Sequence, residues 1–594
     1  MLLTLLACTP EPVAKSDGPA YGMILKEDGQ LYAGAARIEI TPEIIETYFD
    51  KNENHQFDGC MTDPLASRES CNGETYDDVD GDGRFDAVWI AGFQSSRAAL
   101  GVHDPLSVTA VVMALNGEYF ALVGVDALGV LENRIRDARD LLHADGFDRD
   151  RVIVSSSHAH SAPDTAGIYG RDEDIISGIY PPFIESLAPA IHDAIELAAG
   201  SMVAVSPKQG AVHMTAPEMN GVPFGGINPD TEVEGLIHDI RDPMIAADQV
   251  LSIALDGEKG RVATIVSNSG HPETGGDEHS LLSADYPGVI RDWIDTKDGG
   301  VTLFMSGALG GMQSALGGTL PMIDEDGVPV LDGAGAPTWI SGSSWEFVRV
   351  YGTLIAQAAQ SSWTDTTPWD AISFAKSDFL IPVDNTSFKL AFQVGLIDTP
   401  DEYVVQDSTC PGYGTNPDNF GCVPSASWML QLGPTTFGSF PGELMPELFW
   451  GVPDEPAMTD DALRQGDRRW VQEDPECIGV DFEDCRNNEE VRVDDCDGPE
   501  GALCDGICDC LHQHATPYVI SSDPTVIPIA DMLPGTFKAP IGIANAYCGY
   551  IVPEPDFSTY VSVLTEDGDH YEETNSCSRN FAPIVQKAFQ ELTR

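Results

Sequence analysis

Residues 151–164 read RVIVSSSHAHSAPD, and this stretch decides how we interpret the fold. The run from Val152 to Val154 is apolar and β-branched, which is typical of a buried strand. Three serines follow it, and His158 and His160 come soon after. Because alternate residues of an extended chain point to the same side, both imidazoles can face one site. Ligands tend to bind where the strands of α/β proteins end, so this segment predicts a functional site at a strand end.

The rest of the chain alternates between strand-like and helix-like patterns. Residues 107–128 predict a β-hairpin with Asn116-Gly117 as its turn. Alternation of this kind predicts an α/β fold of mixed α+β character, with sheets flanked by helices. We expect one large domain over residues 21–594. The predicted strands are 107–115, 119–128, 151–157, 250–257, 261–268 and 301–307, and the predicted helices are 131–146, 181–200 and 344–360.

The chain carries 31 basic and 95 acidic side chains, which gives a formal net charge of −64. This composition argues against nucleic acid as a partner, because phosphate binding depends on clustered lysines and arginines. An acidic surface suits a salty or calcium-rich medium, where counterions screen the repulsion between carboxylates. Charge therefore restricts the class of partner and leaves the reaction open.

The N-terminus reads MLLTLLACTPEP, an apolar run that ends at Cys8. This pattern resembles a bacterial lipoprotein signal, so residues 1–20 are expected to be a signal and tether with a lipid on Cys8. The protein would then be exported and attached to a membrane surface, at the outer membrane, in the periplasm or on the cell surface, with later release as an option. An ordinary apolar N-terminus is the alternative. No later stretch has the ~20 apolar residues needed to cross a bilayer.

The cysteines other than Cys8 are even in number, which favours disulfides in an exported chain. Cys60 with Cys71, and Cys410 with Cys422, are plausible local pairs. Six more cysteines crowd an acidic segment without periodicity, about 453–523, which we interpret as a disulfide-stapled insertion. Part of it, Cys504 to Cys510, could instead form a zinc knuckle, but the spacing lacks a standard second pair. We recognise no internal repeat in the chain.

An acidic insertion over residues 45–88 carries oxygen ligands at alternate positions. Two segments match the first, third, fifth and ninth places of a calcium loop, and Gly83 stands where such a loop turns sharply. Neither segment has the glutamate of an EF-hand at its twelfth place, so ligands from elsewhere would have to complete the site. A solvated acidic loop is the alternative for both. The candidate calcium ligands are Asp78, Asp80, Asp82 and Asp86 in one segment and Asp50, Asn52, Asn54 and Asp58 in the other.

A third histidine, His271, again follows an apolar strand pattern, RVATIVSN. Histidines at the ends of two strands are what a zinc site needs, because neutral imidazole is a common zinc ligand and the metal requires converging groups. Alternatively, His271 caps a turn or bonds to a carboxylate such as Asp285. The spacing alone does not decide between these interpretations.

The sequence resembles the neutral, or alkaline non-lysosomal, ceramidase family over most of its length. Several blocks follow the family's order, and an ordered series is more specific than any single block. SSSHAHSAPD, for example, resembles the family's T-H-T-H-S-G-P block. The blocks are AGAARIEITP, AGFQSSRAALGVHDPL, SSSHAHSAPD, HPETGGDEHSLLSADYPG, FMSGALGGMQSA, FPGELMPEL, NAYCGYIVPEPDF and HYEETNS.

The resemblance implies a zinc hydrolase that acts on a lipid amide such as ceramide, and it implies roles for particular residues. The zinc ligands would be His158, His271, Glu443 and Tyr550. His160 would polarise the amide carbonyl or move a proton, and Tyr571 would help to bind substrate or stabilise the oxyanion. In simpler interpretations, Glu443 is a carboxylate at a helix start and the two tyrosines are core residues.

The loop that carries the family's serine is altered here. Ser314 takes the serine's place if one residue is inserted, and Gln313 takes it otherwise, so attack by Ser314 or by metal-activated water both stay open. We expect no C-terminal immunoglobulin-like domain beyond residue 594. A zinc esterase or amidase for another acyl substrate, and a catalytically silent calcium-binding surface lipoprotein, are the alternative functions.

Overall fold

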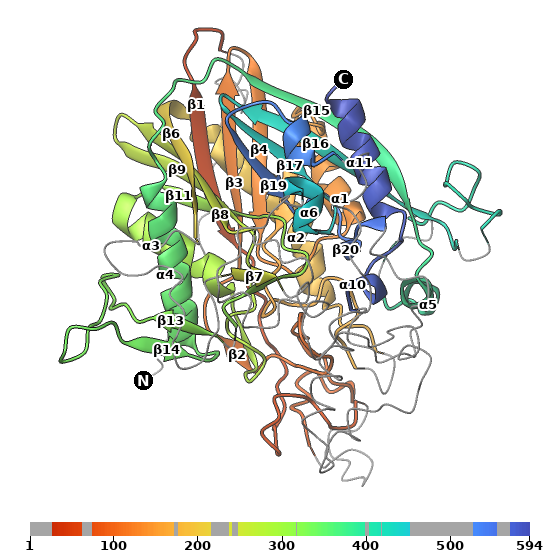
Figure 1. Ribbon diagram of the computed structural model, residues 1–594. Coiled ribbons are helices and arrows are strands. Elements are labelled where there is room, and N and C mark those ends of the chain that lie inside the picture. The colour runs from red at the N-terminus through yellow and green to blue at the C-terminus, as the bar shows by residue number, and fades with distance from the viewer. Residues whose placement is uncertain are drawn as a thin grey trace, which may run out of the picture.

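Two packed β-sheets flanked by helices form the core of the computed structural model (Figure 1). This arrangement confirms the predicted mixed α/β fold. The structure describes residues 26–61, 74–171, 176–214, 237–239, 247–316, 318–397, 399, 403–416, 419–451, 527–554 and 571–594.

The larger sheet has eight strands in the order β11-β9-β8-β6-β1-β3-β4-β5. The predicted hairpin is confirmed as β3 and β4, and Asn116 and Gly117 both have positive φ, as its tight turn requires. Most neighbouring strands are antiparallel, but β4 and β5, and β9 and β11, are parallel pairs. The strands are β1 Tyr32–Glu39, β3 Ser107–Leu115, β4 Glu118–Val125, β5 Val152–Ser156, β6 Val203–His213, β8 Gln249–Gly257, β9 Gly260–Asn268 and β11 Val301–Ser306.

Four helices cover one face of this sheet. Helices α1 (Glu132–Ala144) and α2 (Pro181–Gly200) pack on the half that contains β3, β4 and β5, as alternate residues such as Val112 show. Helices α3 (Asp285–Asp298) and α4 (Trp345–Ser361) pack side by side on the other half (Figure 1). The second sheet, described next, covers the opposite face. The larger sheet is therefore buried on both faces, which explains why its strands have almost continuous apolar sequences.

The second sheet packs against the other face of the first. It has the order β15-β16-β17-β19, and Trp428 of β16 is fully buried between the two sheets. Helix α11 (Phe581–Leu592) covers its outer face (Figure 1). The periodicity did not predict this sheet. Its strands are β15 Ile372–Pro382, β16 Cys422–Leu432, β17 Thr435–Ser439 and β19 Phe537–Ile541.

Short elements complete the described chain. Strand β18 (Glu443–Leu444) pairs with β20 (Tyr550–Ile551), and this pair lies at the site described below. The other short pairs are β2 Gly101–Val102 with β10 Leu281–Leu282, β7 Ile237–Asp239 with β12 Met312–Ser314, and β13 Thr319–Pro321 with β14 Trp339–Ser341; the short helices are α5 Thr386–Val394, α6 Pro446–Trp450, α9 Ile529–Met532 and α10 Tyr571–Thr574.

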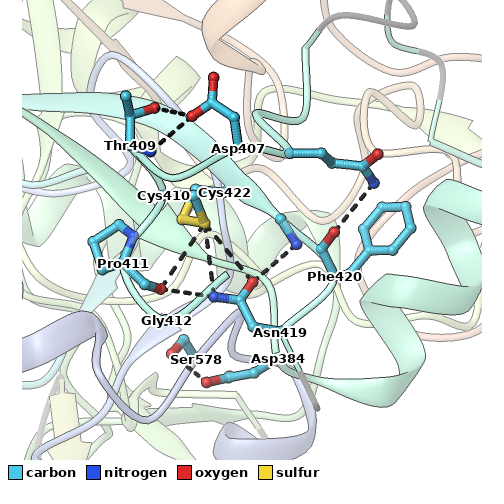
Figure 2. The surroundings of a disulfide bond; sticks show 12 residues. Asp384, Asp407, Thr409, Cys410, Pro411, Gly412, Asn419, Phe420, Cys422 and Ser578 are labelled. Atoms are coloured by element: carbon cyan, nitrogen blue, oxygen red, sulfur yellow. Dashed lines mark hydrogen bonds between the residues drawn. A yellow bond between two sulfur atoms is a disulfide. The ribbon is translucent and has the colours of Figure 1, made fainter. Parts of the chain in front are cut away.

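Two disulfides join described cysteines. The predicted Cys410–Cys422 bond is confirmed, and Figure 2 shows Asn419 beside it, where its side-chain amide donates to the carbonyl of Pro411 at 2.7 Å. Cys548 pairs with Cys577. Cys60 is also oxidised, but its predicted partner Cys71 lies outside the described residues.

Other predictions also fall outside the described residues. They are the signal and tether of residues 1–20 with Cys8, and the cysteine-rich insertion at about 453–523. Among the helices that the structure describes, none is both long enough and apolar enough to span a bilayer.

Candidate active site

The first histidine of the site, His158, lies just past the end of β5. Its backbone N–H donates to the carbonyl of Ala127 at 2.9 Å, and its φ of 68° is unusual for a residue other than glycine. Its Nδ1 lies 2.7 Å from the carbonyl of Leu128. A carbonyl only accepts, so Nδ1 carries the hydrogen and Nε2 keeps its lone pair. Strained backbone that is held by such contacts is common at functional sites.

His271 follows β9, and its Nδ1 lies 2.7 Å from the carbonyl of Met312, so its neutral form has the same tautomer as His158. Although β5 and β9 lie near opposite ends of the strand order, the two imidazole centroids are only 5.0 Å apart. The sheet is curved enough to bring β11 against β5, where Ser306 Oγ donates to the carbonyls of Ser156 and Ser157 at 2.8 and 3.0 Å. Curvature of the sheet therefore brings the two histidines together.

Glu443 completes this group from the short strand β18. Its Oε2 lies 3.5 Å from Nε2 of His158 and 3.4 Å from Nε2 of His271, and it has no hydrogen-bond partner in the described structure. Its other oxygen, Oε1, accepts a hydrogen bond from the hydroxyl of Tyr547 at 3.0 Å. Tyr550 stands directly opposite Glu443 in the β18–β20 pair. Sequence reasoning missed Tyr547, although it is the first tyrosine of the block NAYCGYIVPEPDF.

Burial and mutual contact shift the pKa values of Glu443 and His271 in opposite directions. Burial raises the pKa of the Glu443 carboxyl, but the two imidazoles outweigh burial and hold the pKa well below its usual range. Burial lowers the pKa of His271, but the Glu443 carboxylate 3.4 Å from its Nε2 and the charge of Glu273 outweigh burial and raise the pKa to about 9. The carboxylate therefore stays ionised and stabilises positive charge beside it.

His160 lies close to the same group. One nitrogen from each of His158, His160 and His271 falls within 4.8 Å of the others, so the three could hold a metal ion. Both ring nitrogens of His160 are buried and lack hydrogen-bond partners among the described residues. Burial, followed by the other two histidines, lowers the pKa of His160 well below its usual value, which keeps the ring neutral.

Five of these side chains, His158, His160, Glu443, Tyr547 and Tyr550, line a cavity with an empty volume of about 700 Å³. Most of its wall is apolar or aromatic, and the Cys548–Cys577 disulfide forms part of it. Helix α5 contributes Phe388 and Phe392. A cavity of this kind suits a ligand with an apolar chain. The lining residues are Gly92, Leu131, His158, His160, Ala166, Ile168, Tyr169, Phe388, Phe392, Ile397, Tyr403, Val423, Glu443, Tyr547, Cys548, Tyr550, Asn575 and Cys577.

The structure does not bring Ser314 to the wall of this cavity. Ser314 is fully buried in β12, where its Oγ accepts a hydrogen bond from the N–H of Leu316 at 3.2 Å. The side chains of Gln313 and Tyr571 lie outside the described residues. The roles that the family resemblance implies for these residues therefore stay predictions.

The Asp78 loop is organised around Glu46, a buried residue from upstream of both predicted loops. Glu46 Oε1 and Oε2 each accept a backbone N–H at 2.8 Å, from Val79 and Asp86. Carboxylate oxygens of Glu46, Asp78 and Asp80 lie within 4.8 Å of one another and could hold a cation. Asp82 and Asp86 are not part of that group.

The Asp50 loop is held in the same way by a glutamate, Glu74, which lies just before the Asp78 loop in the sequence. Glu74 Oε1 accepts the N–H of Lys51 at 3.0 Å, and Glu74 Oε2 accepts the N–H of Asp58 at 2.7 Å. The side-chain amides of Asn52 and Asn54 also donate to Asp58 Oδ2, at 2.9 and 3.0 Å. The glutamate that lies just before each loop in the sequence therefore binds the other loop.

The two loops are copies of one repeat, which we call the acidic repeat. The bridge between Tyr48 and Tyr76 and the matching hydrogen bonds on its two sides give the pair an approximate twofold symmetry. Phe57 and Phe85 pack together at its centre, with centroids 4.6 Å apart. The prediction that the chain has no internal repeat is therefore wrong. The pattern ETY…D…FD, which both loops share, was the sequence signal for the repeat. The residues Glu46, Thr47, Tyr48, Asp50, Phe57 and Asp58 correspond to Glu74, Thr75, Tyr76, Asp78, Phe85 and Asp86.

Comparison with known proteins gives a result at the level of structure only. No protein-family model matches the chain, and no curated protein matches it significantly. The structure is similar to neutral ceramidase from Pseudomonas aeruginosa, with a TM-score of 0.52 and 12% identity over 95% of this chain and 74% of that one. A ceramidase complexed with C2 gives a TM-score of 0.52 and 13% identity, over 95% of this chain and 75% of that one. The chain therefore has the fold of the neutral ceramidases, the family that its ordered sequence blocks resemble.

Proposed function

We propose that this protein is a zinc-dependent hydrolase of N-acyl amide bonds, with ceramide (N-acylsphingosine) as the substrate. The observation that carries the proposal is the group around Glu443 Oε2. Two imidazole nitrogens face this oxygen at 3.4 and 3.5 Å, and His158 and Glu443 line a largely apolar cavity. The ceramidase fold supports the same reaction class.

The residues present fit a zinc ion. Glu443 Oε2 is buried and has no hydrogen-bond partner among the described residues, which is costly unless a cation binds there. Both histidines donate Nδ1–H to backbone carbonyls, the arrangement that orients Nε2 toward a metal. His158, His271, Glu443 and Tyr550 would hold the ion. When bound, zinc supplies Lewis-acid chemistry, which polarises a carbonyl and favours ionisation of water near neutral pH.

The chain's own residues would bind the substrate and move a proton. The apolar wall, including Phe388 and Phe392, would bind a hydrocarbon chain and exclude water from it. His160, which is neutral and buried in the wall of the cavity, could accept a proton at a ring nitrogen. Water adds to the carbonyl carbon, the C–N bond breaks, and the nitrogen takes a proton. The products are a fatty acid and a free amine.

A metal analysis combined with a hydrolysis assay on the full chain tests this proposal. We expect one zinc per chain, hydrolysis of N-acylsphingosine, loss of activity with a chelator, and recovery on adding zinc. His158→Ala should lose both zinc and activity. The proposal is wrong if the purified protein binds no zinc, or if His158→Ala hydrolyses the substrate as fast as wild type.

Two alternative functions use parts of the same molecule. Esters or other acyl amides would fit the same metal group, and turnover of ceramides, N-acyl amino acids and simple esters would separate these substrates. A silent calcium-binding lipoprotein is supported by the altered serine loop, and it requires calcium binding without hydrolysis of any acyl amide.

Calcium binding by the acidic repeat is a further part of the proposal. Oxygen donors of the type that calcium prefers lie together in the Asp78 loop, and Glu46 adds the carboxylate that the loop itself lacks. Lipidation of Cys8, with export to a membrane surface, is proposed from the sequence alone. Mass spectrometry of the N-terminal peptide from cells that express the full chain would show or exclude the lipid.

A further inference from the structure

His160 is held in place although no described residue forms a hydrogen bond with its ring. Its Cβ and Cγ lie so close to Gly92 that a Cβ added at Gly92 would be 2.4 Å from them. Phe93 packs edge-on against the ring, with centroids 5.1 Å apart. The backbone N–H of His160 donates to the carbonyl of Pro272 at 2.9 Å. Packing and backbone therefore fix the position of the ring, but they do not fix which nitrogen carries its hydrogen.

Glu273 is the carboxylate beside this ring. It is 8% exposed, and its Oε2 lies 3.9 Å from Nδ1 of His160. Its Oε1 accepts the backbone N–H of Ser314 at 3.4 Å, and its own N–H donates to the carbonyl of His271 at 2.9 Å. Because the backbone of His160 is bonded to the residue before Glu273, the two side chains are carried by connected loops.

We propose that Glu273 is a positioning residue that accepts the Nδ1–H of His160 and so fixes the tautomer in which Nε2 is the proton acceptor. The inference rests on the proposed function, because it assigns Glu273 a role through His160. A separation of 3.9 Å is longer than a hydrogen bond, and catalytic hydrogen bonds of this kind commonly shorten when substrate binds.

The role is chemically complete without any change in Glu273. His160 Nε2 accepts one proton as water adds to the carbonyl carbon, and it returns a proton to the nitrogen as the C–N bond breaks. Nδ1 keeps its hydrogen throughout, and Glu273 stabilises the imidazolium that forms in between. Without the carboxylate, a neutral imidazole can carry its hydrogen on Nε2 and then cannot accept a proton there.

Kinetics on the zinc-loaded full chain give the first test. We expect Glu273→Gln to lower kcat on N-acylsphingosine by about 10- to 100-fold, with KM and zinc content unchanged, as is typical of residues that orient a ligand or base. In the His160→Ala background the same change should have less than about a twofold effect, because the two residues act as a unit. Glu346→Gln, the same substitution on the exposed start of α4, should change neither constant.

Nitrogen-15 NMR of histidine-labelled protein gives the second test and does not depend on activity. The His160 signals, assigned by their loss in His160→Ala, should show Nδ1–H in wild type and at least partial Nε2–H in Glu273→Gln. The proposal is overturned if wild type carries Nε2–H, if the tautomer is unchanged in Glu273→Gln, if that variant loses zinc, or if its effect simply multiplies that of His160→Ala. Failure of ceramide hydrolysis in wild type would overturn the proposed function, while the NMR result would still decide the role of Glu273.

Discussion

The histidine–glutamate group and the acidic repeat gather possible metal ligands in opposite ways. His158, His271 and Glu443 come from distant segments and are buried; a curved sheet brings the two histidines together, and the short strand β18 adds Glu443. The ligands of each acidic loop lie within a few residues of one another, are largely exposed, and are held by backbone N–H groups. The first group depends on the whole fold, whereas the second depends on local backbone geometry and one glutamate from its twin. Changes in the two regions should therefore have separate consequences.

The largest expected effect follows removal of charge at the buried group. Glu443→Gln should lower kcat/KM on N-acylsphingosine by more than about 1,000-fold, equivalent to about 4 kcal/mol, because an amide is a poor zinc ligand and the two histidines lose their carboxylate partner. Zinc per chain should fall in parallel, as measured by elemental analysis. Glu185→Gln, at an exposed position of α2, should keep both. Full activity in Glu443→Gln would mean that the ion, or the reaction, lies elsewhere.

The next effect tests the exchange of glutamates in the acidic repeat. Glu46→Gln should weaken calcium binding by the Asp78 loop by about 30-fold, roughly 2 kcal/mol, because calcium affinity depends on the number of charged ligands. Isothermal titration calorimetry with calcium should show one of two sites weakened. Glu46→Gln should add little to Asp78→Ala but should add its full effect to Asp50→Ala. If the effect of Glu46→Gln adds in full to Asp78→Ala only, or to neither variant, Glu46 does not serve the Asp78 loop and the exchange is contradicted.

A smaller effect is expected at Tyr547, which donates a hydrogen bond to Glu443. Tyr547→Phe removes the hydroxyl that donates to Glu443 Oε1 at 3.0 Å, and hydrogen bonds to charged groups contribute about 1.5–3 kcal/mol. We expect a loss of about tenfold in kcat/KM and weaker zinc retention during dialysis against a chelator. Tyr413→Phe, in the loop beside Cys410, serves as the control. Unchanged zinc retention in Tyr547→Phe would show that Glu443 is positioned by other contacts.

The two regions also differ in what the sequence could predict. Periodicity predicted β3, β4, β5, β8, β9, β11 and the helices α1, α2 and α4, because each buries a face with a regular pattern, but it did not predict α3. The second sheet escaped prediction, because most residues of its strand β15 are half-buried and the strand has no clear apolar face.

The candidate site divides in the same way. Spacing within one segment indicated His158, His160 and both acidic loops, whereas Glu443 and Tyr550 came from the family resemblance alone. Local sequence gave no reason to bring β5, β9 and β18 together. The curvature that brings β5 close to β9 and the position of β18 beside them are properties of the packed sheets. Tyr547 and the exchanged glutamates were missed for the same reason, since their partners are distant in sequence or lie in the other repeat.

The smallest effect concerns the backbone of the acidic repeat, where equivalent residues should respond with opposite signs. His55 and Gly83 occupy the same place in the two loops and both have positive φ, 62° and 80°. A side chain in this conformation costs roughly 1 kcal/mol, which Gly83 avoids and His55 does not. Gly83→Ala should therefore lower the free energy of unfolding by about 1 kcal/mol, although no atom of the described residues lies within 4 Å of the added Cβ.

His55→Gly should raise the free energy of unfolding by up to about 1 kcal/mol, less whatever the contact of His55 with Asp50 contributes. Urea unfolding at a fixed calcium concentration measures both changes. Gly200→Ala is the matched control, because its added Cβ also meets no atom but its φ lies outside the positive range, so alanine should stabilise the end of α2. If His55→Gly and Gly83→Ala shift stability in the same direction, the two loops do not share a backbone requirement, and the repeat would be a likeness of sequence without a common structural cause.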